Sequence, residues 1–341
     1  MFNYKKALFM DALKKRIPLT TTIEIIGECN FRCIHCYIDD ECRRNVLSLE
    51  DIENFGDQIT SMGCLYVVLT GGEVLLHPDF KKIYLYFIKK GLCVSVFTSG
   101  SLIDESIIDL FVQYPPKQIE ITMYGANNDT YSAVIRRRTH DVVLSNILKL
   151  KNKNINVLVK MFVTKENFPD FREIECFVKQ NQLPFKFDST ILATPYSEEK
   201  SHQIEDKKVI ELERERIKTV SRFDEDVHNT LAELCKNKLY QCGAGRSSCW
   251  LKSNNHLRMC NFLSCIDYDM KNVSFADAWN MMSTYIDESK AIESKCYLCK
   301  YQSYCDYCPA KSYMTFGTPT MILQEQIFCK VAQERYVMLN E

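Results

Sequence analysis

Three cysteines lie within eight residues near the N-terminus, in the segment GECNFRCIHCY, and no obvious fourth cysteine accompanies them. Cys29, Cys33 and Cys36 have the spacing Cys-x3-Cys-x2-Cys. A structural zinc ion takes four ligands in a closed tetrahedron, whereas three thiolates suit a [4Fe–4S] cluster in which one iron lacks a protein ligand. An open iron can bind a chelating small molecule, so the spacing predicts a catalytic cluster.

The C-terminal third of the chain holds a second set of closely spaced cysteines. They are Cys242, Cys249, Cys260, Cys296, Cys299, Cys305, Cys308 and Cys329. In a long chain without a signal peptide, clustered cysteines indicate metal binding, by iron–sulfur clusters or zinc, rather than disulfides. The six other cysteines are expected to act as small buried apolar residues. They are Cys42, Cys64, Cys93, Cys176, Cys235 and Cys265.

Length and charge restrict the remaining possibilities. At 341 residues the chain can bury one large core and a second, smaller one. Its 43 Lys and Arg residues balance 44 Asp and Glu residues, so it lacks the basic excess of a nucleic-acid-binding protein. No apolar run is long enough to span a bilayer, and residues 1–18 lack the features of a signal peptide. We therefore expect a cytoplasmic protein whose partners include neither nucleic acid nor membrane.

The first half of the sequence alternates between strand and helix patterns. Strands are expected at 20–27, 64–73, 93–101, 117–125, 155–164 and 184–192. Helices are expected at 48–63, 77–92, 104–115, 140–154 and 168–182, the first of them opened by Ser48. These β–α units predict a parallel sheet with right-handed crossovers, closed or open as a barrel. The site of such a barrel lies on the loops after the strands, and the Cys29 loop follows the first strand.

A densely charged stretch of mixed sign separates the two halves of the chain. It runs from about Ala193 to Asn237 and is expected to be a solvated helical linker, with partner recognition as the alternative. The chain is therefore divided into a barrel at 1–192, a linker at 193–237 and a cysteine-rich domain at 238–341.

The cysteine spacing, and its place after the first strand, resemble the radical S-adenosylmethionine (SAM) superfamily. The resemblance implies an α/β fold, a partial (β/α)6 TIM-like barrel. It also implies that SAM binds the open iron, is reductively cleaved, and yields a 5′-deoxyadenosyl radical that abstracts hydrogen. Three further segments fit in order after successive strands: TGGE, FTSG and ITMYG.

The resemblance places cofactor-binding residues in these segments. Gly71 and Gly72 allow a close backbone turn, and Glu73 would accept hydrogen bonds from the cationic SAM amino group. Ser99 would contact the ribose of SAM. Thr122 would face the mouth of the barrel.

Three more residues complete the expected cofactor site. His35 would stack near the adenine, in preference to ligating metal, because Cys36 already has the ligand role. Tyr37 follows it in the same loop. Arg136, with the two arginines after it, would pair with the SAM carboxylate.

The C-terminal cysteines resemble the SPASM domain, a seven-cysteine extension of peptide-modifying radical SAM enzymes. The resemblance implies two auxiliary [4Fe–4S] clusters and therefore three clusters in all. One would use Cys242, Cys249, Cys260 and Cys308. The other would use Cys296, Cys299, Cys305 and Cys329.

This region departs from the SPASM pattern in two places. Asn255 replaces a glycine, which is a mild change because Asn tolerates the left-handed conformation. The spacer before Cys308 has two residues instead of three. Cys235 or Cys265 stays open as a replacement for Cys249.

The resemblance as a whole implies an enzyme that installs a thioether or carbon–carbon crosslink in a ribosomally made peptide. Asp188, near the end of the sixth strand, is a candidate base or a structural carboxylate. Expected partners are the precursor peptide and a flavodoxin- or ferredoxin-type electron donor. Only 28 residues precede Cys29, so a separate protein would bind the leader peptide, or the barrel and SPASM domain would do so themselves. The alternatives are an anaerobic sulfatase-maturating or small-molecule radical SAM dehydrogenase, and a non-catalytic iron–sulfur or zinc protein.

Overall fold

The computed structural model describes residues 4–36, 38, 41–189, 202–219, 231, 233–236, 238–290, 299–305, 308–319 and 327–340. The strands are β1 (Thr20–Ile26), β2 (Tyr66–Gly71), β3 (Cys93–Thr98), β4 (Gln118–Thr122), β5 (Val157–Phe162), β6 (Phe185–Asp188), β7 (Ser248–Leu251), β8 (His256–Arg258) and β9 (Tyr268–Asp269). The α-helices are α1 (Tyr4–Lys15), α2 (Leu49–Ser61), α3 (Phe80–Lys89), α4 (Glu105–Gln113), α5 (Asn128–Ile135), α6 (His140–Asn152), α7 (Phe171–Gln180), α8 (Asp206–Thr219), α10 (Phe275–Glu288), α11 (Pro309–Phe316) and α12 (Ile327–Asn340). Short 3-10 helices are η1 (Cys42–Arg44), η2 (Val74–Leu76), η3 (Phe168–Asp170) and η5 (Gln302–Tyr304).

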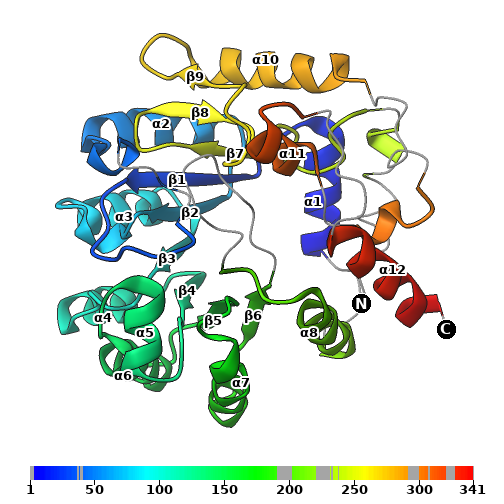
Figure 1. Ribbon diagram of the computed structural model, residues 1–341. Coiled ribbons are helices and arrows are strands. Elements are labelled where there is room, and N and C mark those ends of the chain that lie inside the picture. The colour runs from blue at the N-terminus through cyan, green and yellow to red at the C-terminus, as the bar shows by residue number, and fades with distance from the viewer. Residues whose placement is uncertain are drawn as a thin grey trace.

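One sheet organises the described chain, in the strand order β6-β5-β4-β3-β2-β1-β7-β8-β9. Strands β1 to β6 are parallel neighbours in sequence order, and helices α2 to α7 lie along the connections between them (Figure 1). This confirms the predicted alternation of strands and helices. The carboxyl ends of all six strands therefore meet at one edge of the sheet.

The cysteine-rich region continues this sheet. β7 pairs in parallel with β1, placing Trp250 opposite Thr22, and β8 and β9 follow as antiparallel strands. Asn255, in the turn between β7 and β8, has φ +63°, as expected for a residue standing in place of glycine. The β7–β9 unit thereby sits directly beside the strand that leads into the cysteine loop.

The two faces of the barrel strands differ in character. Ile23 and Ile25 of β1 are fully buried beneath the helices, with many similar residues of the other strands. Because side chains alternate along a strand, Glu24 lies on the opposite face. There it accepts a hydrogen bond from Lys252 Nζ (2.6 Å) and one from Trp250 Nε1 (3.2 Å). The inner face of the barrel is thus polar, whereas the helix-covered face forms the hydrophobic core.

Local capping explains where several helices begin. Ser48 caps α2, since its hydroxyl oxygen accepts from Asp51 N (3.0 Å), as predicted. The helix expected in the charged stretch is present as α8, but it is not simply solvated. Val209 and Leu212 are buried, and Glu213 accepts a hydrogen bond from Arg335 Nε of α12 (2.6 Å). The mixed charges therefore serve a packed helix pair, α8 with α12, which lie together in Figure 1.

The prediction that the scattered cysteines are buried is only partly right. Cys64 and Cys235 are buried, but Cys93, Cys176 and Cys265 are exposed. Cys93 is the first residue of β3, where the sheet ends, which explains its exposure. Among the described helices, none has both the length and the apolar character needed to cross a membrane.

Candidate functional site

The cysteine loop, residues 27–47, joins the end of β1 to the start of α2 and is closed at its base. Gly27 N donates to Asn45 O (2.8 Å), and Leu47 N donates to Ile25 O (3.0 Å). A Cβ on Gly27 would lie 1.9 Å from Cys42 O, so a larger residue could not take this position. The loop therefore starts and ends at the carboxyl edge of the sheet.

Cys29, Cys33 and Cys36 lie together in this loop. Burial raises the pKa of the Cys33 thiol far above its ordinary value, and the charges of Cys36 and Cys29 would raise it further. Burial likewise raises the pKa of Cys29 to about 11. Phe31 N donates to Cys29 Sγ (3.4 Å) and Arg43 Nη2 donates to Cys36 Sγ (3.2 Å). Buried thiols that repel one another once ionised need a positively charged core to hold them as thiolates.

The spacing of side chains in the described residues bears on the kind of metal centre. No three Cys, His, Asp or Glu side chains among them converge on a point that one metal ion could occupy. A single zinc ion would need four donor atoms within about 2.0–2.3 Å. In a [4Fe–4S] cluster each thiolate binds a different iron. Three thiols in one loop can therefore serve such a cluster without converging on one point.

The turn after β2 is anchored on the cysteine loop. Gly72 N donates to Ile26 O (2.7 Å), and Glu73 N donates to Glu28 O (2.8 Å). A Cβ on Gly72 would lie 2.2 Å from Glu28 O, and one on Gly71 would lie 2.3 Å from Ile26 O. The two glycines thus allow the TGGE backbone to contact the backbone that carries the first cysteine.

The Glu73 carboxylate ties this turn to the end of β3. It is fully buried, and its Oε1 accepts from Thr98 Oγ1 (2.6 Å) and Leu75 N (3.1 Å). Its Oε2 accepts from Ser99 N (2.7 Å). A carboxylate has about four acceptor positions, so Glu73 has capacity for one donor of a bound molecule beyond these three.

A short chain of polar groups connects the FTSG segment to the cysteine loop. Ser99 Oγ lies 3.0 Å from Ser101 Oγ, which accepts from Asn30 Nδ2 at 3.0 Å. Asn30 Oδ1 is buried and has no hydrogen-bond partner within the described part of the chain. Buried acceptors normally have a donor, so this atom fits a donor of a bound molecule.

An aromatic wall lies beside the third cysteine. The His35 ring stacks on Phe162 (centroids 4.6 Å apart, planes at 23°) and lies 6.0 Å from the Tyr124 ring. Burial lowers the pKa of His35 to about 4, so the ring is neutral. Thr122, at the end of β4, is half-buried near this wall. Tyr37 lies outside the described residues.

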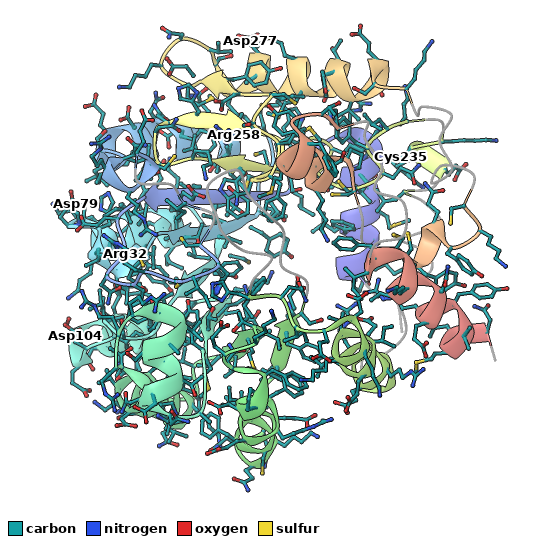
Figure 2. The ribbon with its side chains drawn as sticks, viewed as in Figure 1. Arg32, Asp79, Asp104, Cys235, Arg258 and Asp277 are labelled. Carbon is teal, nitrogen blue, oxygen red and sulfur yellow. The ribbon has the colours of Figure 1, made fainter. Side chains whose placement is uncertain are left out.

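The arginines after α5 differ in their contacts. Arg136 adopts φ +60° at the end of α5, and its side chain is exposed. Arg137 Nε donates to Asn30 O of the cysteine loop (3.3 Å), whereas Arg138 pairs with Asp129 (2.5 Å). Arg32, which is labelled in Figure 2, also ties the loop to the end of α5, because its backbone N donates to Ile135 O. Among the described residues, the side chain of Arg137 is thus the one of these three arginines that donates to the cysteine loop.

Asp188 lies at the open end of the barrel. It is the last residue of β6, and its exposed side chain is on the same strand face as Lys186. Together with Glu213 and Arg335 it lines a polar pocket between β6, α8 and α12. At this location, toward the C-terminal helices, Asp188 can serve as a base or as a structural carboxylate.

Three of the C-terminal cysteines form a second group. Burial, followed by the charges of Cys308 and Cys242, raises the pKa of Cys260 to about 12. Burial, followed by the charges of Cys308 and Cys235, raises the pKa of Cys242. The structure thus brings together three of the expected ligands, Cys242, Cys260 and Cys308, with Cys235 next to Cys242.

Cys249 is not part of this group. It is buried on β7, where its Sγ lies 3.5 Å from Thr21 Oγ1, and the charge that acts on it is that of Cys64. Thr21 alternates with Thr22 on β1 and faces the helix-covered core. Cys249 therefore behaves as a core residue, and Cys235, one of the two replacements considered, lies beside Cys242.

Three of the four remaining expected ligands lie on or beside η5 and α12, two elements that contact each other. Cys299 and Cys305 flank η5, where Cys305 N donates to Gln302 O (3.0 Å). Cys329 lies on α12, which is tied to η5 because Arg335 Nη1 donates to Tyr304 O (2.8 Å). Cys296 lies outside the described residues.

Sequence reasoning missed several residues that contribute to these sites. Tyr124 and Phe162 stand at or just after the ends of neighbouring strands, a position that could have marked them as part of the mouth. Arg43 and Asn30 lie in the loop itself, but nothing in their spacing indicates the contacts they make.

The comparisons with known proteins agree with this arrangement. Residues 23–177 match the family model of the Radical SAM superfamily. The chain is 28% identical over 161 residues to the antilisterial bacteriocin subtilosin biosynthesis protein AlbA of Bacillus subtilis (strain 168), covering 46% of this chain and 36% of AlbA. It is 20% identical over 339 residues to the AdoMet-dependent heme synthase of Methanosarcina barkeri, covering 92% and 96% of the two chains. The match to AlbA thus spans about a third of that protein.

A solved structure shares the fold. Streptococcus suis SuiB bound to S-adenosylmethionine superimposes with a TM-score of 0.73 at 16% identity, over 95% of this chain and 81% of SuiB. SAM and a [4Fe–4S] cluster are the cofactors that the family implies, and the cysteine loop offers three thiols for that cluster. Residues 23–177 of this chain therefore match a radical SAM domain, within a fold that is shared with SuiB.

Proposed function

We propose that this enzyme modifies a ribosomally made peptide, installing a thioether or carbon–carbon crosslink. The observation that carries the proposal is the pair of cysteine groups on one sheet, Cys29 to Cys36 after β1 and Cys242, Cys260 and Cys308 beside β7. Two similar proteins support it. AlbA is a bacteriocin biosynthesis protein, and SuiB has been solved bound to precursor peptide SuiA.

Cys29, Cys33 and Cys36 would hold the SAM-binding cluster. When bound, cluster and SAM supply a radical that removes a hydrogen atom from a substrate C–H bond. Glu73 holds the turn after β2 against β3 and has capacity to accept from the SAM amino group. Asn30 Oδ1 offers a buried acceptor.

The remaining cofactor-site residues would orient SAM and exclude water. Ser99 would offer its hydroxyl to the ribose of SAM, and the His35 ring, stacked on Phe162, would close the mouth on one side. Thr122 lies at the same edge. Arg136 would pair with the SAM carboxylate, and Arg137, whose guanidinium contacts the cysteine loop, is a second candidate for this pairing.

Crosslinking needs an electron acceptor and a proton acceptor. After hydrogen abstraction, a thioether forms when the substrate thiol loses its proton and one electron leaves the new C–S bond. An auxiliary cluster would take the electron, and Asp188 is the candidate for the proton. We assign the first auxiliary cluster to Cys235, Cys242, Cys260 and Cys308, and the second to Cys296, Cys299, Cys305 and Cys329.

We infer the remaining partners from the chemistry. Reductive cleavage of SAM requires a low-potential donor, for which a flavodoxin or ferredoxin is suited. We also propose that a separate protein binds the leader peptide and that the enzyme acts in the cytoplasm. Its chain would be divided into the barrel, the linker and the SPASM domain.

The test searches the neighbourhood of the gene for a short reading frame that encodes a cysteine-rich peptide, and incubates that peptide with the reconstituted enzyme, SAM and reductant. Mass spectrometry should find the peptide lighter by two hydrogen atoms, and a deuterated substrate carbon should transfer its label to 5′-deoxyadenosine. The full-length similarity to the AdoMet-dependent heme synthase favours a second candidate, a small-molecule substrate of the haem class. An unchanged peptide together with turnover of an iron porphyrin would reject the peptide proposal in its favour.

A further inference from the structure

A buried cation lies in the turn that begins with Cys242. Residues 243–248 fold back tightly, with Ser247 N and Ser248 N both donating to Gly243 O (2.8 and 3.0 Å). This turn directs Arg246 inward, where the residue is only 3% exposed. Within the described residues, its Nε and Nη2 atoms, and the neighbouring Ser247 Oγ, have no hydrogen-bond partner.

The protein supplies too little negative charge for this guanidinium. The carboxylate beside it is that of Asp287, and Arg246 Nη2 lies 3.7 Å from Asp287 Oδ1, beyond hydrogen-bond distance. The same Oδ1 already accepts from Arg16 Nη2 (2.6 Å) and lies 3.7 Å from Lys238 Nζ. Three cations therefore share one half-exposed carboxylate. A buried charge that shares its one carboxylate with two other cations is costly, so a further anion is expected here.

Cysteine thiols are the nearest groups that could bring that anion. Cys242 directly precedes the turn that holds Arg246, and the Cys235 thiol lies close enough to Arg246 for a side-chain hydrogen bond. Cys242 in turn lies close enough to Cys308 and Cys260 for their charges to interact. The unpaired guanidinium atoms and the cysteine group therefore occupy the same place in the fold.

We propose that Arg246 is a positioning residue for the auxiliary cluster at Cys235, Cys242, Cys260 and Cys308, balancing its charge and raising its reduction potential. The inference rests on the assignment of that cluster in the proposed function. An iron–sulfur core with four thiolates is negatively charged, and reduction makes it more so. A fixed cation with hydrogen bonds toward its sulfur atoms stabilises the reduced form more than the oxidised one. This makes the cluster a better acceptor for the electron released in crosslinking.

The test measures the cluster itself and does not depend on turnover. The background is the full chain in which Cys29, Cys33 and Cys36 are replaced by Ala, so that only auxiliary clusters contribute. Arg246→Gln removes the charge, and Arg246→Lys keeps it. Arg258→Gln is the matched control, because Arg258, labelled with Cys235 in Figure 2, belongs to the same region but is paired with Asp267 (2.9 and 3.1 Å). Each protein is titrated with dithionite and followed by electron paramagnetic resonance.

Arg246→Gln should shift the one-electron equilibrium about tenfold toward the oxidised cluster, or about 59 mV to lower potential. Arg246→Lys and Arg258→Gln should stay within about threefold of the background. An unchanged potential in Arg246→Gln with full iron content would overturn the inference. If Arg246→Gln loses iron but Arg246→Lys keeps it, the cluster requires the positive charge, which supports the inference. If both variants lose iron, Arg246 has a packing role, and the inference is overturned. A background protein without iron would instead reject the proposed function.

Discussion

Replacing Gly72 with alanine should damage the cluster site more than the fold. The new Cβ would lie 2.2 Å from Glu28 O and 2.4 Å from Gly27 O. Both are backbone atoms that cannot rotate away, so the turn must move by about 1 Å to reach ordinary contact. That movement strains the hydrogen bonds from Gly72 N to Ile26 O and from Glu73 N to Glu28 O.

The expected cost of Gly72→Ala follows from these contacts. Overpacking costs about 1–3 kcal/mol, and each buried amide left without a partner about 1–3 kcal/mol. We expect a loss of about 3 kcal/mol in the free energy of unfolding, which a domain stable by about 5–15 kcal/mol survives. The displaced segment is directly before Cys29, so the SAM-binding cluster should be lost or unable to cleave SAM.

Gly91→Ala is the matched control for Gly72→Ala. Gly91 has φ +78° and no atom within 4 Å of its Cβ position, so alanine there should cost about 1–2 kcal/mol of backbone strain and leave the cluster intact. Urea unfolding gives both stability changes, and iron content with 5′-deoxyadenosine formation reports on the site. Full iron and normal SAM cleavage in Gly72→Ala would refute the close packing of the two turns.

Three further predictions concern side chains of the two cysteine groups. Glu73→Gln should place an amide N–H₂ against one of the two donors, Thr98 Oγ1 or Ser99 N, and so destabilise the protein by about 1–3 kcal/mol and reduce SAM binding. Isothermal titration that finds unchanged affinity would contradict it. Cys235→Ala should remove about four irons per chain, whereas Cys249→Ala, in the core beside Thr21, should keep them, as iron analysis of the two variants will test. Arg43→Gln should lower the potential of the SAM-binding cluster, because the N–H···S contact to Cys36 is lost; a potentiometric titration with no shift would show that this contact is irrelevant.

Local patterns in the sequence predict the barrel half well. Alternating apolar strands and amphipathic helices repeat along residues 20–189, and each signal is contained within one segment. Ser48 at the start of α2 and the left-handed Asn255 are equally local. The three thiols of the cysteine loop are also predictable, because their spacing alone limits how far apart they can lie.

Long-range pairings were not predictable in the same way. The parallel contact of β7 with β1 joins residues more than 200 positions apart, and β7 itself is only four residues long. The place of Cys249 in the core follows from this pairing, because β7 turns its thiol toward Thr21. Helix α1 went unpredicted because its apolar residues are spread around the helix, so no amphipathic pattern marks it.

The central claim is most directly tested by anaerobic reconstitution, with iron and sulfide counted per chain and 5′-deoxyadenosine measured after adding SAM and dithionite. We predict about twelve irons and SAM cleavage in the natural sequence, and about eight irons without cleavage when Cys29, Cys33 and Cys36 are all alanine. Zinc in place of iron, or SAM cleavage that survives the triple substitution, would contradict the account.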